Sequence, residues 1–199
     1  MRTSTLVFDP SKPALNGTSG PDILRGTEAS EIIDGGLGDD RLYANGGDDT
    51  LIGSLGRDVL DGGSGTNTFL YTHLTQSYYA GNATDHADLI RNFDTSNNLI
   101  DVSALGFYGL GNGHADTLLI AVNDAGTRTY VKSYGYDEGG DRFEIAFDGD
   151  VTQYLTEGRI VFAGTGLDTV SIAVDQVQPS ETVNIEPRGV LPESTSGVV

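Results

Sequence analysis

The sequence predicts an all-β fold: a parallel β-roll of six nonapeptide repeats, capped by a C-terminal β-rich region. Three observations lead to this prediction. An apolar residue returns at every ninth position from Leu24 to Phe69, glycine supplies 28 of the 199 residues, and strand-like segments alternate with turn signals after residue 88. Only Ser103–Leu105 and Gln153–Glu157 have the pattern of helical turns.

The chain divides by composition into four parts. These are an N-terminal lead-in (1–16), the repeats (17–70), a β cap of the same module (71–175) and a flexible tail (176–199). The tail holds three prolines and few large apolar residues, which is typical of a segment without a packed core. The stretch from Met1 to Pro10 lacks the apolar region of a signal peptide.

Each repeat follows the template G-G-x-G-x-D-x-U-x, in which U is a large apolar residue. The contiguous copies read GTSGPDILR, GTEASEIID, GGLGDDRLY, ANGGDDTLI, GSLGRDVLD and GGSGTNTFL, from residue 17 to residue 70. Positions seven to nine form a short strand whose eighth residue points inward, and positions one to six form a turn. Disorder in a glycine-rich acidic linker is the competing interpretation, but disorder does not keep an apolar residue at every ninth position.

The repeats predict calcium binding. Their ladder of apolar side chains is too thin to offset the chain entropy lost on folding, and the acidic turns repel one another. Calcium resolves both problems because it binds carboxylate and carbonyl oxygens. The sixth positions supply the candidate ligands Asp22, Glu31, Asp40, Asp49, Asp58 and Asn67. Ions between repeats n and n+2 would use the pairs 40/58, 49/67, 22/40 and 31/49, so we expect about four calcium ions.

The outward residues differ between the two predicted sheets. The odd repeats present Arg25, Arg41 and Tyr43 together, which indicates either an anion- or sugar-binding patch or a solvated strand face with one Arg–Tyr stack. The even repeats present a more apolar face, which we expect later chain to cover in part.

After the repeats, residues 71–87 are polar and loop-like. Seven segments then have strand character: Leu89–Phe93, Leu99–Val102, Thr117–Val122, Thr127–Ser133, Arg142–Phe147, Arg159–Phe162 and Thr169–Val174. In Thr127–Tyr134, which extends the fourth segment by one residue, one face carries Arg128, Tyr130, Lys132 and Tyr134.

Composition excludes several functional classes. The formal charge of −18 argues against a nucleic-acid partner, and no run of about 20 apolar residues predicts a membrane span. The absence of cysteine excludes disulfides and thiol chemistry. His73, His86 and His114 are scattered in polar contexts and form no zinc motif. The sequence therefore predicts no catalytic residues.

The segments NTFLY (67–71), DLIRNFD (88–94) and NNLIDVSALGFYGLGNG (97–113) resemble the cap that follows RTX calcium-binding repeats in secreted metalloproteases and alginate epimerases. The continuation at 117–150 is similar to the R-modules of calcium-dependent mannuronan C5-epimerases. The resemblance covers roughly residues 15–175. It implies a non-catalytic accessory module that binds calcium, modulates a separate catalytic module, and in some members binds alginate.

The resemblance also implies residue roles and partners. Asp22, Asp40, Asp49 and Asp58 match the calcium-ligand positions of the family, whereas Glu31 and Asn67 depart from aspartate there. Asp88 and Asp101 match acidic cap positions that would serve one further calcium ion, and the basic positions Arg128, Lys132 and Arg142 would face a polyuronate. The expected partners are alginate, the catalytic module and other R-modules of the same chain.

We expect a monomeric module, the C-terminal one of its chain, exported by type I secretion. Because alginate is a polyanion and four ions would leave a charge of about −10, we expect weak alginate binding. The alternatives are a calcium-dependent RTX folding, export or adhesion module without polysaccharide affinity, and a lyase or epimerase fragment with its own chemistry.

Overall fold

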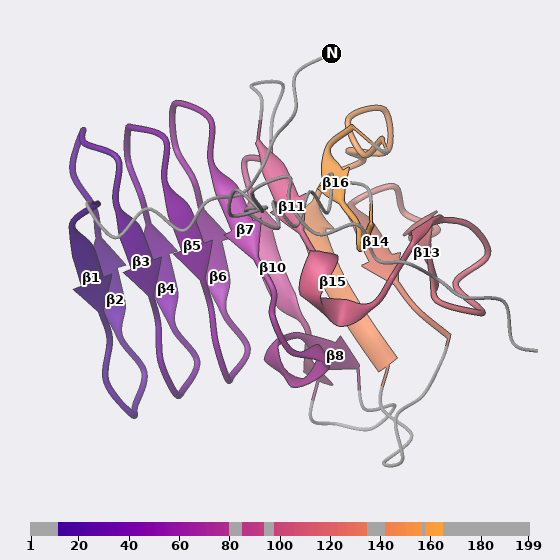
Figure 1. The fold of residues 1–199 in the computed structure, drawn as a ribbon, viewed down its shortest axis with the longest axis horizontal. Helices are drawn as coiled ribbons and strands as arrows, with labels where there is room; N and C mark the ends of the chain where they lie inside the picture. The colour runs from indigo at the N-terminus through magenta and orange to yellow at the C-terminus, as the bar shows by residue number, and fades with distance from the viewer. Residues whose placement is uncertain (1–11, 80–84, 94–97, 135–141, 157, 165–199) are drawn as a thin grey trace, which may run out of the picture. The chain divides into compact units, whose positions relative to one another are not determined.

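The computed structural model describes residues 12–79, 85–93, 98–134, 142–156 and 158–164 (Figure 1). Its strands form a six-stranded sheet in the order β1-β3-β5-β7-β11-β16 and a ten-stranded sheet that follows β12-β13-β14-β15-β10-β6-β4-β2, with β8 and β9 attached beside β15. The all-β prediction is confirmed. The strand predicted at Thr169–Val174 and the tail (176–199) lie outside the described residues.

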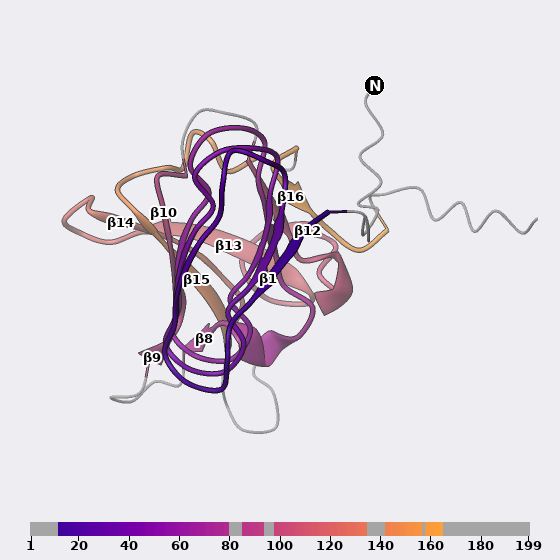
Figure 2. The ribbon, with the colours of Figure 1, turned by 90° about the vertical axis from the view of Figure 1, so that its left-hand side faces the viewer.

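The repeats form the predicted parallel β-roll, whose coils superpose when viewed along the roll (Figure 2). Its strands are three residues long: β2 (Ile23–Arg25), β3 (Ile32–Asp34), β4 (Arg41–Tyr43), β5 (Thr50–Ile52), β6 (Val59–Asp61) and β7 (Thr68–Leu70). Strands pair in parallel at a spacing of two repeats, so Leu42 lies opposite Leu60 and Leu51 opposite Phe69. These four eighth-position side chains are completely buried.

One strand lies within the predicted lead-in. β1 (Ala14–Asn16) pairs in parallel with β3 and places Leu15 opposite Ile33. The roll therefore begins before the first complete repeat at Gly17. On the even face, Ile32 and Thr68 are buried, whereas Ile52 and Leu70 are half-buried.

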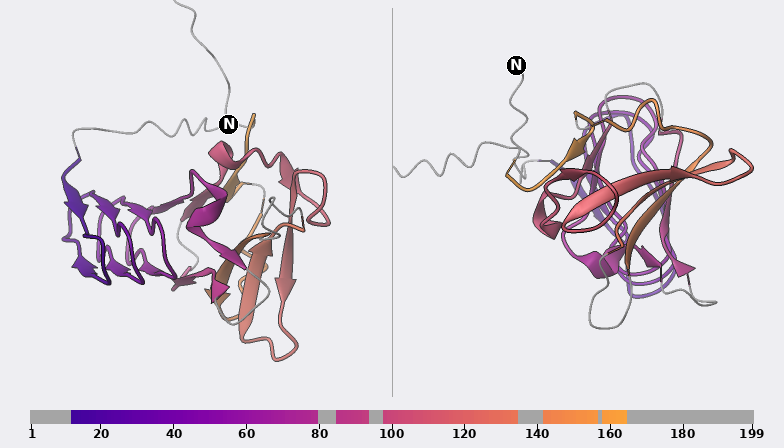
Figure 3. Two further views of the ribbon diagram at one scale, coloured as in Figure 1. Left: turned by 90° about the horizontal axis from the view of Figure 1, so that it is seen from below. Right: turned by 90° about the vertical axis from the view of Figure 1, so that its right-hand side faces the viewer.

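The cap continues both sheets of the roll (Figure 3). β10 (Asp88–Arg91) pairs in parallel with β6, and β11 (Leu99–Asp101) pairs in parallel with β7. The other cap strands are β12 (Gly109–Leu110), β13 (Thr117–Val122), β14 (Arg128–Lys132), β15 (Arg142–Asp148) and β16 (Ile160–Val161). The six cap strands predicted from Leu89 to Phe162 are thus confirmed, with small changes at their ends.

The predicted loop at 71–87 is wrong in part. It contains the 3₁₀ helix η1 (Leu74–Gln76) and the strands β8 (Tyr78–Tyr79) and β9 (Asp85–His86). β8 forms because it pairs with the start of β15, more than 60 residues later, which local pattern does not reveal. The helical turn at Ser103–Leu105 is confirmed as η2, and hydrogen bonds from the Tyr154 and Leu155 amides close turns at the second predicted position.

Aromatic side chains join the ladder of the roll to the core of the cap. The rings of Phe69 and Phe93 have centroids 6.1 Å apart, and Phe93 meets Phe147 edge-on at 5.2 Å. Tyr71 and Phe107 each contact Phe143 with centroids 5.6 Å apart. No helix among the described residues is long and apolar enough to cross a membrane.

Candidate calcium centre

The turns of the odd repeats carry a ladder of carboxylates. Asp40 Oδ1 accepts the Asp22 amide hydrogen at 2.7 Å, and Asp58 Oδ1 accepts that of Asp40 at 2.8 Å. Asp88 Oδ1 then accepts the Asp58 amide hydrogen at 2.9 Å. The structure therefore brings the predicted cap ligand Asp88 into the same ladder as the repeat ligands.

A second ladder follows the even repeats. Asp49 Oδ1 accepts the Glu31 amide hydrogen at 2.7 Å, and Asn67 Oδ1 accepts that of Asp49 at 3.0 Å. Asn98 completes it by accepting the Asn67 amide hydrogen at 2.9 Å. Sequence reasoning missed Asn98, because it follows no repeat and reaches its place only through the pairing of β11 with β7.

Four carboxylates present a second oxygen with no protein partner. The Oδ2 atoms of Asp40, Asp49, Asp58 and Asp88 are buried and accept no hydrogen bond, and each residue is at most 1% exposed. A buried, unpaired carboxylate oxygen is costly unless a cation or proton neutralises it. Hard oxygen ligands of this kind suit Ca²⁺, so these four residues fit the ion that the repeats predict.

Burial raises the pKa values of these carboxyl groups in the absence of metal. It raises the pKa of Asp49 to about 6 and that of Asp58 to about 7, with neighbouring carboxylates adding to the effect. The pKa of Asp40 is also raised, mainly by burial, and that of Asp88 is raised well above its usual range by burial and by Asp58. A bound cation would remove the cost of ionising them.

First-position glycines let the coils approach these oxygens. A Cβ on Gly35 would lie 2.5 Å from Asp40 Oδ2 and 2.8 Å from the Gly53 carbonyl oxygen. Among the described residues, no three His, Cys, Asp or Glu side chains gather around one point. A calcium ion here would therefore draw further ligands from the backbone carbonyls of the turns, as the sequence predicts.

The remaining predicted ligands have hydrogen-bond partners within the protein, unlike the free oxygens of the four carboxylates. Asp22, Glu31 and Asn67 occupy their ladder positions, but hydrogen bonds within their own turns satisfy their outer side-chain atoms. Asp101 is buried at the end of β11, and its Oδ1 accepts the Ser103 amide hydrogen at 2.9 Å.

The predicted basic groups share one sheet. Arg25, Arg41 and Tyr43 lie on β2 and β4, and the second group lies on β14 and β15 of the same ten-stranded sheet. The Arg25 guanidinium lies 4.4 Å from the Tyr43 ring centroid, which is the Arg–Tyr stack expected. Arg41 is exposed, and the described residues offer it no ion pair.

On the cap, Lys132 lies between two tyrosines. Its Nζ is 5.8 Å from the ring centroid of Tyr130 and 5.7 Å from that of Tyr134. Arg142 already makes contacts within the protein. Its guanidinium pairs with Glu144 at 2.9 Å and lies 4.4 Å from the Tyr79 ring centroid. Arg142 is therefore less available to a ligand than Lys132.

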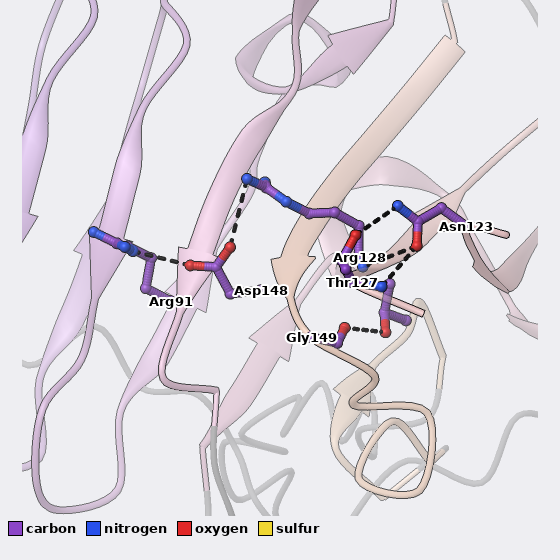
Figure 4. A network of polar contacts seen from close by, with 7 residues as sticks. Arg91, Asn123, Thr127, Arg128, Asp148 and Gly149 are labelled. Carbon is purple, nitrogen blue, oxygen red and sulfur yellow. Dashed lines mark hydrogen bonds and ion pairs between the residues drawn. The ribbon is translucent and has the colours of Figure 1, made fainter. Parts of the chain in front are cut away.

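Arg128 shares a carboxylate with Arg91, which the sequence did not single out (Figure 4). Asp148 lies 3.0 Å from Arg91 Nε and 3.5 Å from Arg128 Nη2. The backbone of Arg128 is held by Asn123, whose Oδ1 accepts the amide hydrogens of Thr127 at 2.8 Å and Arg128 at 3.1 Å. The ion pairs of Asp148 with Arg91 and Arg128 neutralise part of the basic surface.

The family described as RTX calcium-binding nonapeptide repeat (4 copies) matches residues 14–42 and 34–69. The solution structure of the AlgE6R3 subunit from the Azotobacter vinelandii mannuronan C5-epimerase is 40% identical, with a TM-score of 0.64, and covers 94% of this chain and 99% of that one.

Two curated proteins of Azotobacter vinelandii are similar over about half of this chain. Mannuronan C5-epimerase AlgE3 is 48% identical over 109 residues, which span 51% of this chain and 6% of the epimerase. Alginate lyase 7 is 40% identical over 94 residues, which span 47% of this chain and 11% of the lyase. The chain thus corresponds to a small part of each curated relative.

Proposed function

This chain belongs to the calcium-binding R-modules of mannuronan C5-epimerases, and from that membership we propose that it is a non-catalytic accessory module of an alginate-modifying enzyme. It would modulate the action of a catalytic module on alginate and contact the polymer weakly. We place it outside the cell after type I secretion, as a monomeric part of a longer chain that includes the catalytic module and other R-modules.

The roles of the histidines support a non-catalytic module. Epimerisation of a uronate needs an acid, a base and a group that neutralises the carboxylate. His86 stacks on Tyr78 with centroids 4.9 Å apart, and His114 stacks on Tyr134 at 5.0 Å. His73 interacts with Thr72 through Nδ1 at 3.0 Å. These contacts give each histidine a structural role.

The proposed alginate contact rests on one observation: contacts between a cation and a tyrosine ring occur at two places on one ten-stranded sheet. From β2 to β14 the sheet order crosses five strand spacings, or about 24 Å, enough for several sugar units. Tyrosine rings suit the apolar face of a sugar, and Arg or Lys pairs with its carboxylate. Arg41 and Lys132 would be the main cations.

Charge limits the affinity of this surface. Asp148 and Glu144 already pair with three of the basic groups on the sheet, and the formal charge of the chain is −18. Exposed ion pairs contribute at most about 1 kcal/mol each. We therefore propose a dissociation constant in roughly the high micromolar to millimolar range.

NMR shift mapping with oligomannuronate in calcium tests the proposal. We expect shifts at Arg25, Arg41, Tyr43, Tyr130 and Lys132, and their loss at about 0.5 M salt. Arg41→Gln should weaken binding, whereas Arg57→Gln, an equal charge change in an exposed turn, should not. Tight, salt-insensitive binding elsewhere would refute the location. The absence of any shift would favour a module for calcium-dependent folding, export or adhesion without polysaccharide affinity.

A further inference from the structure

The turns of the roll fall into two conformational classes. At the second repeat position, Gly36, Asn45, Ser54 and Gly63 adopt left-handed φ angles of 92°, 69°, 69° and 65°. Thr18 and Thr27 occupy that position in repeats one and two and lie outside this region. The fourth position divides in the same way, since the glycines of repeats three to six have positive φ and Gly20 and Ala29 do not.

In the first repeat, Thr18 satisfies the sixth-position carboxylate. Its amide and its hydroxyl both donate to Asp22 Oδ2, at 2.6 Å and 2.8 Å. Thr18 Oγ1 in turn accepts the Gly20 amide hydrogen at 3.3 Å. The oxygen that has no partner in Asp40 and Asp58 therefore has two donors in Asp22.

In the second repeat, a threonine again donates hydrogen bonds to the sixth-position carboxylate. The Thr27 amide donates to Glu31 Oε2 at 2.8 Å, its hydroxyl donates to Glu31 Oε1, and its Oγ1 accepts the Ala29 amide hydrogen at 3.1 Å. Glu31 is only 7% exposed, yet both of its carboxylate oxygens are paired. The longer side chain thus reaches the hydroxyl of its own turn.

In the sixth repeat, the side-chain amide of Asn67 closes the turn. Asn67 Oδ1 accepts the Asp49 amide hydrogen, which leaves Nδ2 to face the turn, where it donates to the Gly62 carbonyl at 2.8 Å. A Cβ on Gly62 would lie 2.8 Å from this nitrogen, just as one on Gly35 would lie 2.5 Å from Asp40 Oδ2. The amide nitrogen therefore takes the place of the free carboxylate oxygen.

We propose that Thr18, Thr27 and Asn67 replace calcium in their turns, so that the protein closes turns one, two and six without an ion at their sixth-position side chains. The ions are then confined to the places where Asp40, Asp49, Asp58 and Asp88 present unpaired oxygens. The roll ends at its N-terminus in two metal-independent turns. This assignment is independent of the proposed alginate contact. It differs from the expectation drawn from the sequence, in which the sixth-position side chains of all six repeats are candidate calcium ligands.

Calcium counting on the folded 199-residue chain tests this assignment. Native mass spectrometry in calcium should give the same number of ions for the wild type, Asp22→Asn and Glu31→Gln. Asn67→Asp restores a carboxylate in a turn with the left-handed backbone, and it should bind one ion more. A lower count for Asp22→Asn or Glu31→Gln, or an unchanged count for Asn67→Asp, would overturn the proposal.

Thermal unfolding in calcium tests the hydroxyl itself. Thr18→Val removes the donor to Asp22 at nearly constant volume, and it should lower the melting temperature without changing the ion count. Thr50→Val is the matched control, because Thr50 lies in a strand and its hydroxyl makes no hydrogen bond with the described residues. Equal melting temperatures for Thr18→Val and Thr50→Val would contradict the role of Thr18.

Discussion

Asp88 Oδ1 accepts the backbone amide hydrogen of Asp58 at 2.9 Å, although 30 residues separate the two along the chain. Both residues are completely buried, and neither Oδ2 atom has a partner. Tyr71 lies beside them, and its buried hydroxyl interacts with the Asp88 carboxylate. Burial and the Asp88 carboxylate raise the pKa of Tyr71 well above its usual value. This pair therefore joins the last odd repeat to the cap. Its two buried carboxylates lie together, so a cation that neutralises them would be most stabilising here.

Asp88→Asn should have opposite effects with and without calcium. In calcium it removes an anionic ligand, and we expect a loss of roughly 3 kcal/mol in the free energy of unfolding. In chelator it removes the cost of ionising or protonating this buried carboxyl group while keeping the acceptor for Asp58, so the variant should be more stable than the wild type. Thermal unfolding under both conditions checks this, and destabilisation of equal size in both would argue against a cation at Asp88.

Asp40→Ala should cost more stability in calcium than Asp22→Ala. Asp40 is 1% exposed and lies between two neighbours in the ladder, whereas Asp22 is half-buried and has one. Melting temperatures of the two variants in calcium provide the comparison. Equal losses would count against the order of the ladder described here.

The calcium-free fold should be more stable at pH 5 than at pH 8. The pKa of Asp49 is raised to about 6 and that of Asp58 to about 7, from an ordinary value of 3.8. Groups with raised pKa values stabilise the fold fully below the ordinary value, and the contribution is lost as the pH rises through 6 to 7.

Calcium competes with these protons, so its affinity should fall as the pH drops from 8 to 5. Unfolding of calcium-stripped protein and calcium titration at both pH values measure the two effects. Asp58→Asn should flatten both pH profiles. Calcium-free protein that gains stability between pH 5 and pH 8 would contradict the assignment of these groups.

Gly35→Ala should destabilise the roll by about 1–3 kcal/mol, the usual cost of overpacking. The added Cβ would meet Asp40 Oδ2 and the Gly53 carbonyl at 2.5 Å and 2.8 Å. Gly20→Ala is the matched control in the first repeat, where a Cβ meets nothing within 4 Å. Denaturant unfolding in calcium measures both, and similar stability for the two variants would exclude a close approach at Gly35.

The sequence was sufficient to predict the roll, because its contacts are periodic. A residue spacing of 18 places Leu42 opposite Leu60, and the same spacing places Asp40 beside Asp58. The cap offers no such period. Asn98 reaches Asn67 across 31 residues, and β8 pairs with β15 from a segment that looks like a loop. Such contacts depend on long-range packing that composition and alternation do not encode.

The basic surface was predicted less completely for a related reason. Arg142 was expected to face a ligand, yet it pairs with Glu144 of the same strand, and Arg128 shares Asp148 with Arg91. The sequence shows which residues carry charge, but their pairing depends on strand register. The threonines at position two were overlooked because the repeat template assigns glycine there and does not describe what a hydroxyl would do.

We expect cations on the carboxylate ladder to hold the β-roll together. Far-UV circular dichroism of the chain in calcium, and again after excess EDTA, tests it most directly. We expect the β-sheet signal to fall on chelation and to return when calcium is restored, because calcium binding supplies much of the folding free energy. A spectrum that excess EDTA leaves unchanged at pH 8 would show that the roll holds its fold without these cations.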